Sequence, residues 1–457
     1  MTNRLLFFCF TLSALLFSGC PKQSPVQNEP PASPSSVKSP VATPAKSTAL
    51  RETSEEKVVR ERTEQLGGTI RKNQAGQIIG VVIESNELTL ADMQLIAQLS
   101  DLESIRLKSA FLDDDFVKVL SGLTQLKSVD FESSNITDRS LEILKEFPDI
   151  ETLSLRQNVK LSDNAVALFA EFPNLKTLNI LYNNHLSPAS LLKLGKLSSL
   201  RVLDVRGCQV GDDTLYFISK LEHLEEIRIR SNQVTNEGIE DIVNCKKLKL
   251  LELQDTSIEA GCAVFFNEME NLRNLRIFRA PQFNAKAVSE LGVLTNLETL
   301  ELRGLNSSNE SLQALKTLTK LKTVEFSELT DVDAATIVDV LKSYPALESV
   351  RMFAMPVDDS VAEYLATIPA LKSVALPATA ITDKGLDVLT ALKNLQTLDI
   401  HGNKELITLQ GAQALTKFRN LRRLILPETL DNKDLKSTIL KSSPRCVTTV
   451  KTYSQEG

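Results

Sequence analysis

Apolar residues recur along most of this chain in one pattern, L-x-x-Φ-x-Φ, where Φ is any apolar residue. Two examples are the segments 126–131 (LKSVDF) and 395–400 (LQTLDI). Successive copies are 24 to 26 residues apart, and they start at Leu102, Leu126, Ile150, Leu175, Leu200, Leu224, Leu248, Leu272, Leu297, Leu321, Leu347, Leu371, Leu395 and Leu421. Degenerate copies near Ile78 and Val447 extend the array at both ends. The alternation within each copy predicts a strand with one buried face.

The second half of each repeat predicts a turn and a short helix. The position eight residues after the first Leu is small and polar in most repeats, where a side chain can bond the backbone of the turn. It holds Asn86, Ser134, Asn158, Asn183, Cys208, Asn232, Thr256, Thr379, Asn403 and Thr429. An apolar residue, a Thr or Asp and an L-x-x-L spacing follow, as in 136–144 and 381–389, which predicts a capped helix with one apolar face.

The period and the consensus resemble those of the leucine-rich repeat across nearly all of residues 78–453. The resemblance implies an α/β fold, a leucine-rich-repeat solenoid shaped as a curved horseshoe, with parallel strands on the concave face and short helices on the convex face. The Ile-Thr-Asp-x-x-Leu-x-x-Leu segments are similar to the helix-bearing repeats of bacterial proteins and of eukaryotic F-box receptors. No F-box-like helical segment accompanies them, so a ubiquitin-ligase function is not expected.

The first 20 residues have the layout of a secretory signal. Arg4 precedes an apolar run, residues 5–17, that is shorter than the about 20 residues needed to span a bilayer. The ending 16–20 (LFSGC) resembles the bacterial lipobox, although Phe17 departs from its usual Leu. The resemblance implies that Cys20 is lipidated and becomes the mature N-terminus. The alternative is an ordinary signal peptide in which Cys20 is incidental.

The remaining boundaries follow from composition. Residues 20–50 hold seven of the 17 prolines and few large apolar side chains, which is typical of a disordered tether. The predicted organisation is a signal peptide at 1–19, the lipidated cysteine and tether at 20–50, an N-terminal cap with the first degenerate repeat at 51–101, repeats at 102–430 and a C-terminal cap and tail at 431–457. We expect a lipid-anchored protein of the bacterial cell envelope. Pro21, which is not the inner-membrane retention aspartate, favours the outer membrane.

Composition excludes several classes of protein. A chain with 42% hydrophobic residues is not globally disordered, and a net charge of −6 argues against a general nucleic-acid binder. His185, His223 and His401 lie far apart in the sequence, and no phosphate-binding glycine loop or nucleophile elbow is present. We therefore expect no catalytic site, no cofactor and no metal. Asp-rich segments such as 113–115 and 358–359 recur at helix starts, where capping explains them better than calcium does.

The six cysteines do not suggest a disulfide framework. Cys9 falls in the signal, and Cys20 is the lipidation candidate. The others are irregularly spaced, and buried free thiols are the favoured interpretation. They are Cys208, Cys245, Cys262 and Cys446.

The strand residues that face away from the core lie two, four and six positions after each first Leu. Many of them in the middle repeats are arginines accompanied by two phenylalanines. The candidate partner-binding residues are Arg206, Arg228, Arg230, Arg276, Phe278, Arg303, Arg351 and Phe353, and Arg156 is a further arginine at such a position. Exposed aromatics among arginines are typical of an interface hot spot. The alternative is a solvated charge ladder in which Asp204, Glu252 and Glu301 offset the positive charges.

Four consecutive repeats lack the small polar residue after the strand. Ala280, Leu305, Leu329 and Met355 stand there instead, so these turns are expected to pack differently. This is a second reason to place a site near residues 272–356.

Three functions compete. The first is a membrane-anchored, non-enzymatic protein that binds another protein through the concave face of its repeats. The second is an envelope module that binds carbohydrate or an anionic ligand on the concave arginine stripe, although carbohydrate sites usually contain Trp or Tyr and Trp is absent. The third, an enzyme with a shallow acidic site, has the least support. No nucleic-acid partner is expected.

Overall fold

The structure is a computed structural model that describes residues 53–403 and 405–451. Contacts divide the chain into two units, Met1–Thr48 and Ala49–Gly457, and the description concerns the second unit alone. The predicted signal peptide, the predicted lipidation site Cys20 and the whole predicted tether lie outside the described residues. Within the described ranges, no helix combines the length and the apolar character needed to cross a bilayer.

The described residues form one sheet of 17 strands. β1 pairs with β2 in antiparallel orientation, and from β2 onward each strand pairs in parallel with the next one along the chain. The strands are β1 Thr69–Lys72, β2 Ile78–Glu84, β3 Ser104–Lys108, β4 Ser128–Glu132, β5 Thr152–Arg156, β6 Thr177–Asn179, β7 Val202–Asp204, β8 Glu226–Arg230, β9 Leu250–Gln254, β10 Asn274–Phe278, β11 Thr299–Arg303, β12 Thr323–Ser327, β13 Ser349–Arg351, β14 Ser373–Ala375, β15 Thr397–Asp399, β16 Arg423–Pro427 and β17 Val447–Lys451.

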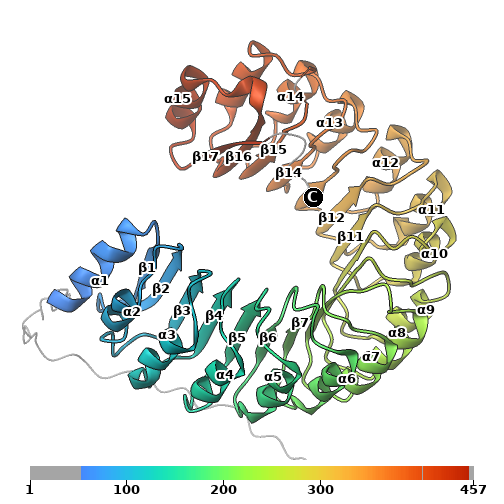
Figure 1. Ribbon diagram of the computed structural model, residues 1–457. Helices are drawn as coiled ribbons and strands as arrows, with labels where there is room; N and C mark the ends of the chain where they lie inside the picture. The colour runs from blue at the N-terminus through green and yellow to red at the C-terminus, as the bar shows by residue number, and fades with distance from the viewer. Residues whose placement is uncertain (1–52, 404, 452–457) are drawn as a thin grey trace, which may run out of the picture. The chain divides into compact units, whose positions relative to one another are not determined.

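A short helix or a 3-10 turn follows each parallel strand up to β16. The α-helices are α1 Ser54–Gln65, α2 Leu90–Ile96, α3 Asp114–Val119, α4 Asp138–Leu144, α5 Asp163–Leu168, α6 Pro188–Leu191, α7 Asp212–Ile218, α8 Asn236–Ile242, α9 Ala263–Glu268, α10 Ala285–Glu290, α11 Asn309–Ala314, α12 Ala334–Leu341, α13 Asp359–Leu365, α14 Asp383–Leu389 and α15 Lys433–Ser442. In this unit the strands line the inner, concave side of the curve and the helices its outer, convex side (Figure 1). The predicted solenoid is confirmed.

The core lies between the sheet and the helices. Strand residues at the inward positions stack in register, so that Leu251 of β9 lies opposite Ile227 of β8 and Leu275 of β10. All three side chains are fully buried. Each repeat forms one coil of the solenoid. Each coil therefore buries its apolar face mainly against the coils on either side of it.

The small polar residues after the strands connect neighbouring coils. Oδ1 of Asn183 accepts a hydrogen bond from the backbone N–H of Asn158 at 2.8 Å, and its Nδ2 donates to the carbonyl of Leu155 at 2.7 Å. Nδ2 of Asn158 in turn donates to the carbonyl of Phe131 at 2.9 Å. The predicted bonding of the turn is confirmed, and it extends from one coil to the next.

The four repeats without this residue pack differently, as expected. Ala280, Leu305, Leu329 and Met355 are all buried. The N–H of Leu329 faces the sulfur of Met355 at 3.4 Å, and a thioether is only a weak acceptor. Apolar packing replaces the side-chain hydrogen bonds in this part of the array.

One recurrent backbone feature was not predicted. Seven residues after the first Leu, the chain leaves most strands through a residue with a positive φ angle. Glycine stands there at Gly207, Gly304 and Gly402, but other residues do so as well. They are Ser133, Gln157, Tyr182, Asp255, Arg279, Glu328, Ala354 and Ala378. A residue in the left-handed backbone conformation turns the chain sharply. Its own side chain, seven positions after the first Leu, therefore points away from the strand axis.

Threonine and aspartate at the helix starts have separate roles. Thr137 caps α4, while the carboxylate of Asp114, from the coil before, accepts hydrogen bonds from the N–H of Thr137 at 2.9 Å and its hydroxyl at 2.6 Å. The same bond recurs between coils in Ser162–Asp138, Ser187–Asp163, Thr235–Asp212, Thr382–Asp359 and Thr408–Asp383. The helix-start aspartates are therefore explained by capping and by contacts between coils.

Both predicted ends of the array are covered, with two differences. Val59 and Leu66 of the N-terminal segment and Leu435 and Ile439 of α15 are buried against the core. The apolar pattern of these two segments also predicts burial of Val58 and Leu440, but both are exposed, because each lies on the solvent side of its helix. The sequence of residues 67–83, with turn residues at 73–76, predicts a β-hairpin, and β1 and β2 form it.

The bond between Thr382 and Asp359 explains a glycine within α14. A β-carbon on Gly385 would collide with Oδ1 of Asp359 and lie 2.6 Å from Cγ2 of Ile381. Gly385→Ala should therefore lower the free energy of unfolding by about 1–3 kcal/mol, although alanine is the better helix former by about 1 kcal/mol. Chemical denaturation would measure the change. Gly122→Ala is the control, because nothing lies within 4 Å of that position, and equal losses in both variants would contradict the explanation.

Candidate functional site

In the middle repeats the concave surface carries a row of charged side chains four positions after the first Leu. Across β7 to β12 the row runs Asp204, Arg228, Glu252, Arg276, Glu301 and Glu325. In-register pairing places each of these residues directly beside the next, about 4.8 Å away. Opposite charges alternate along the row as far as Glu301.

Glu252 is the centre of this row. Its side chain is only 3% exposed, and three arginines surround its carboxylate. The shortest distances are 2.9 Å to Nη1 of Arg206, 3.3 Å to Nη1 of Arg276 and 3.6 Å to Nε of Arg228. Removal of one member would leave buried charge uncompensated, so these arginines also stabilise the fold.

The same arginines contact further carboxylates. Nη2 of Arg206 lies 2.7 Å from Asp204, Nη2 of Arg228 lies 2.8 Å from Glu226, and Nε of Arg276 lies 3.0 Å from Glu301. The candidate cations were expected to face solvent, but they are half-buried among acids. Their surroundings therefore match the alternative interpretation, a charge ladder in which acidic side chains offset the arginines.

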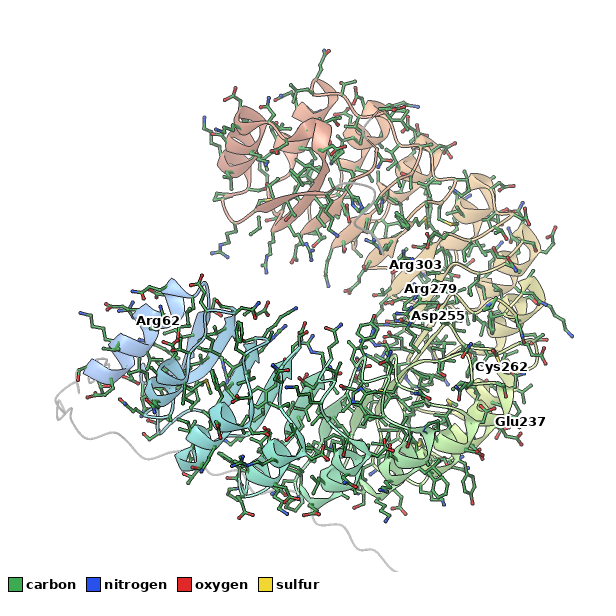
Figure 2. All side chains as sticks on the ribbon, in the orientation of Figure 1. Arg62, Glu237, Asp255, Cys262, Arg279 and Arg303 are labelled. Carbon is green, nitrogen blue, oxygen red and sulfur yellow. The ribbon has the colours of Figure 1, made fainter. Side chains whose placement is uncertain are left out.

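Arg230 and Arg303 are held by turn residues. Arg230 and Arg279 share the carboxylate of Asp255, and Arg230 also donates to the hydroxyl of Tyr182 at 3.2 Å. Nε of Arg303 lies 2.7 Å from Oε2 of Glu328. Arg303, Arg279 and Asp255 lie together on the inner side of the curve (Figure 2).

These turn residues escaped the sequence analysis for a structural reason. Asp255, Arg279 and Glu328 occupy the seventh position of their repeats, where φ is positive. The strand alternation that predicts outward positions ends before this turn. The signal that would have found them is the seventh column of the repeats taken by itself.

The two candidate phenylalanines differ. Phe278 is half-buried at the end of β10 and pairs in register with Arg303. Phe353 is only 3% exposed, so its expected exposure is wrong. β13 ends at Arg351, the N–H of Phe353 donates to Oγ of Ser327 at 3.1 Å, and the guanidinium of Arg303 covers the ring at 5.3 Å.

A hollow of about 340 Å³ lies on the concave side over the C-terminal strands. Small residues of β13 to β15 form part of its lining, including Ser349, Ser373 and Ala375. Charged side chains of both signs surround them, namely Glu301, Glu325, Arg351, Asp399, Arg423 and Lys451. This is a polar, open depression on the sheet.

Asp399 and His401 form a buried pair beside this hollow. The side chains are 2% and 0% exposed, and Nδ1 of His401 lies 2.6 Å from Oδ1 of Asp399. Nη1 of Arg351 approaches the same carboxylate at 3.4 Å. Arg351 also lies 3.6 Å from Glu325, so it connects the two acids across the sheet.

The described residues give little support to a metal site or to a reactive cysteine. In the described part of the chain, no three His, Cys, Asp or Glu side chains are grouped as metal ligands would be. Cys208, Cys245, Cys262 and Cys446 are free and buried, which confirms the expected state of these thiols. Burial raises the pKa of Cys208 to about 12, so its thiol stays protonated at neutral pH.

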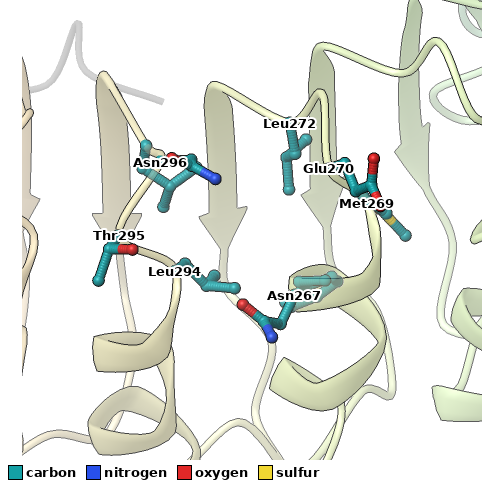
Figure 3. A pocket seen from close by; sticks show the side chains of 9 residues that line it. Asn267, Met269, Glu270, Leu272, Leu294, Thr295 and Asn296 are labelled. Carbon is teal, nitrogen blue, oxygen red and sulfur yellow. The ribbon is translucent and has the colours of Figure 1, made fainter. Parts of the chain in front are cut away.

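A second cavity lies between the turn that connects α9 to β10 and the turn that connects α10 to β11 (Figure 3). Met269, Leu272 and Leu294 line it together with Asn267 and Asn296. Its volume of about 20 Å³ leaves room for a water molecule rather than a ligand. It is a packing gap between coils.

Comparison with known proteins gives a family and several similar structures. The family profile described as "Leucine-rich repeat region" matches residues 159–436. No curated protein matches the chain. Among solved structures, the chain is similar to the internalin inlF of Listeria monocytogenes, with 21% identity, 78% of this chain and 98% of that chain covered, and a TM-score of 0.47. It is also similar to a leucine-rich repeat protein of Leptospira interrogans, with 17% identity, 78% and 91% covered, and a TM-score of 0.33.

Burial raises the pKa of Glu301 to about 7, Arg276 opposes the shift, and Glu325 and Glu252 add to it. Between pH 4.5 and 7 the folded chain therefore holds more protons than the unfolded chain, and stability falls as pH rises through this window. Glu301→Gln should remove this pH-dependent loss of stability. Its stability relative to the unaltered protein should rise between pH 4.5 and pH 7.5 by on the order of 2 kcal/mol.

Urea denaturation at several pH values would measure the effect. Glu237→Gln, on the convex side (Figure 2), controls for the loss of one carboxylate. A difference between Glu301→Gln and the unaltered protein that stays constant over this range would contradict the assignment.

Proposed function

Because the chain belongs to the leucine-rich repeat family, we propose that it is a membrane-anchored, non-enzymatic protein that binds another protein through the concave face of its repeats. Repeats make up most of residues 78–451 of the described chain, and their strands pair into one continuous sheet. Such a surface suits recognition of an extended partner.

The ion pairs around Glu252 are the observation that carries this proposal. Three arginines and Glu252 hold one another in place, so their exposed edges are ordered before a partner arrives. Side chains that are already ordered lose little conformational entropy on binding. Phe278 stands beside this network, half-buried, with an apolar ring available at its edge.

The same ion pairs weigh against an anionic ligand on the concave arginine stripe. Each candidate arginine there already contacts at least one carboxylate, so an anion would have to compete with Asp204, Glu252, Asp255 or Glu328. A protein surface can instead add hydrogen bonds around an intact network. Protein recognition is therefore the favoured function, and carbohydrate or anion binding the alternative.

The first test is recovery of a partner. Residues 51–457, used as bait against envelope extracts, should retain one partner saturably. Phe278→Ala should then weaken binding about thirtyfold, as hot-spot truncations of about 2 kcal/mol do. Tyr216→Ala, an exposed aromatic on the convex helix α7, is the matched control and should leave affinity unchanged. A partner that binds both variants as tightly as the unaltered protein would place the interface elsewhere.

The anchor is tested separately. Cys20→Ser should abolish labelling by radioactive palmitate and release the protein from membranes. Cys9→Ser, within the proposed signal, should leave both unchanged. Labelling that persists in Cys20→Ser would remove the lipoprotein assignment. Separation of the two membranes on a density gradient would then test the proposed outer-membrane location.

A further inference from the structure

A second charge ladder follows one flank of the sheet, just before the strands begin. It occupies the position directly after the first Leu of each repeat, and its charges alternate over most of the array. From the second repeat on it reads Lys127, Glu151, Lys176, Arg201, Glu225, Lys249, Arg273, Glu298, Lys322, Glu348, Lys372, Gln396 and Arg422. Glu103 precedes this row.

The cations of this flank ladder pair with acids one coil away. Representative distances are 2.6 Å for Lys176–Glu151, 3.0 Å for Arg201–Glu225 and 2.7 Å for Lys322–Glu298. Lys127, Lys249 and Lys372 pair in the same way. Arg273 differs, since its guanidinium donates to the carbonyls of Glu270 and Leu272.

The alternation stops at the C-terminal end. Gln396 stands where an acid would follow Lys372, and the position after Arg422 is Cys446. Arg422 therefore has no acid beside it in the ladder. Among the residues that the structure describes, no carboxylate forms an ion pair with Arg422 or with its neighbours Arg419 and Arg445.

These three arginines line one hollow of about 250 Å³. Its other lining residues are Asn420, Leu421, Ser443 and Pro444, so every ionisable side chain at its edge is a guanidinium. All three arginines are exposed. The hollow lies where β16 and β17 begin, at the C-terminal end of the described sheet (Figure 1).

The surrounding sequence adds to this positive charge. Residues 417–451 hold nine lysines and arginines against three acidic residues, in a chain whose net charge is −6. Positive charge concentrated in this way raises the local concentration of anions. Three guanidinium groups at one hollow also repel one another, and a bound anion would relieve that repulsion.

We propose that this hollow binds a phosphate group. Guanidinium groups match phosphate geometry with paired hydrogen bonds. The site lies on the flank of the sheet, apart from the concave ion-pair network, and does not depend on the proposed protein partner. Its ligand carries the phosphate either in solution or on a lipid headgroup.

The experiment uses residues 20–457 with Cys20→Ser, so that no acyl chain attaches the protein to vesicles. Calorimetry with pyrophosphate at 150 mM NaCl measures binding in solution. Flotation with phosphatidylglycerol vesicles, compared with phosphatidylcholine vesicles, measures binding to a headgroup. Saturable binding of pyrophosphate supports a soluble ligand, and selective flotation with phosphatidylglycerol supports the headgroup.

Three variants test the residues. Arg422→Gln and Arg445→Gln should each weaken binding about tenfold or more, because each removes a charge-assisted hydrogen bond. Gln396→Glu should weaken it comparably, because it restores the missing acid beside Arg422. Arg201→Gln is the matched control, since it removes the same charge from the same ladder where Glu225 pairs with it, and it should bind normally.

Two results would overturn the proposal. One is the absence of saturable binding to pyrophosphate together with equal flotation on both vesicles. The other is unchanged binding in Arg422→Gln and Gln396→Glu. Circular dichroism of each variant shows that folding is retained, as expected for exposed side chains.

Discussion

In-register pairing of parallel strands is the constraint on which the rest of this structure depends. It places the same position of every repeat about 4.8 Å from its counterpart in the next coil. No coil can bury its apolar strand face alone, so Leu251 is buried because Ile227 and Leu275 lie beside it. The residues at one repeat position form a column along the solenoid. Each of them must therefore be compatible with the residues at the same position in the neighbouring coils.

Every column satisfies this requirement in a different way. The inward column is apolar from β2 to β16, and asparagine can repeat because its amide both donates and accepts. Asn183, for example, bonds Asn158 and the carbonyl of Leu155. A column of one charge would repel itself, so the charged columns alternate instead. Glu252 among three arginines on the concave face is the most deeply buried example.

The alternation of charges is interrupted in two columns, and the charges at these places are not balanced by the neighbouring coils. Glu301 and Glu325 lie side by side in the concave row, and burial raises the pKa of Glu301 to about 7. Gln396 interrupts the flank ladder and leaves Arg422 without an acidic neighbour. Regular columns stabilise the solenoid, and both of these interruptions lie in its C-terminal half.

The sequence by itself determined the repeat register, the inward and outward positions, the helix caps and both end segments, because all of these follow from local periodicity. It also indicated that Arg228 and Arg276 face away from the core. Only the tertiary structure decided their partners. Asp255 and Glu328 reach Arg230 and Arg303 through left-handed turns, and the early end of β13 buries Phe353 beneath Arg303. These contacts join residues 24 or more positions apart, so the alternation within one strand does not predict them.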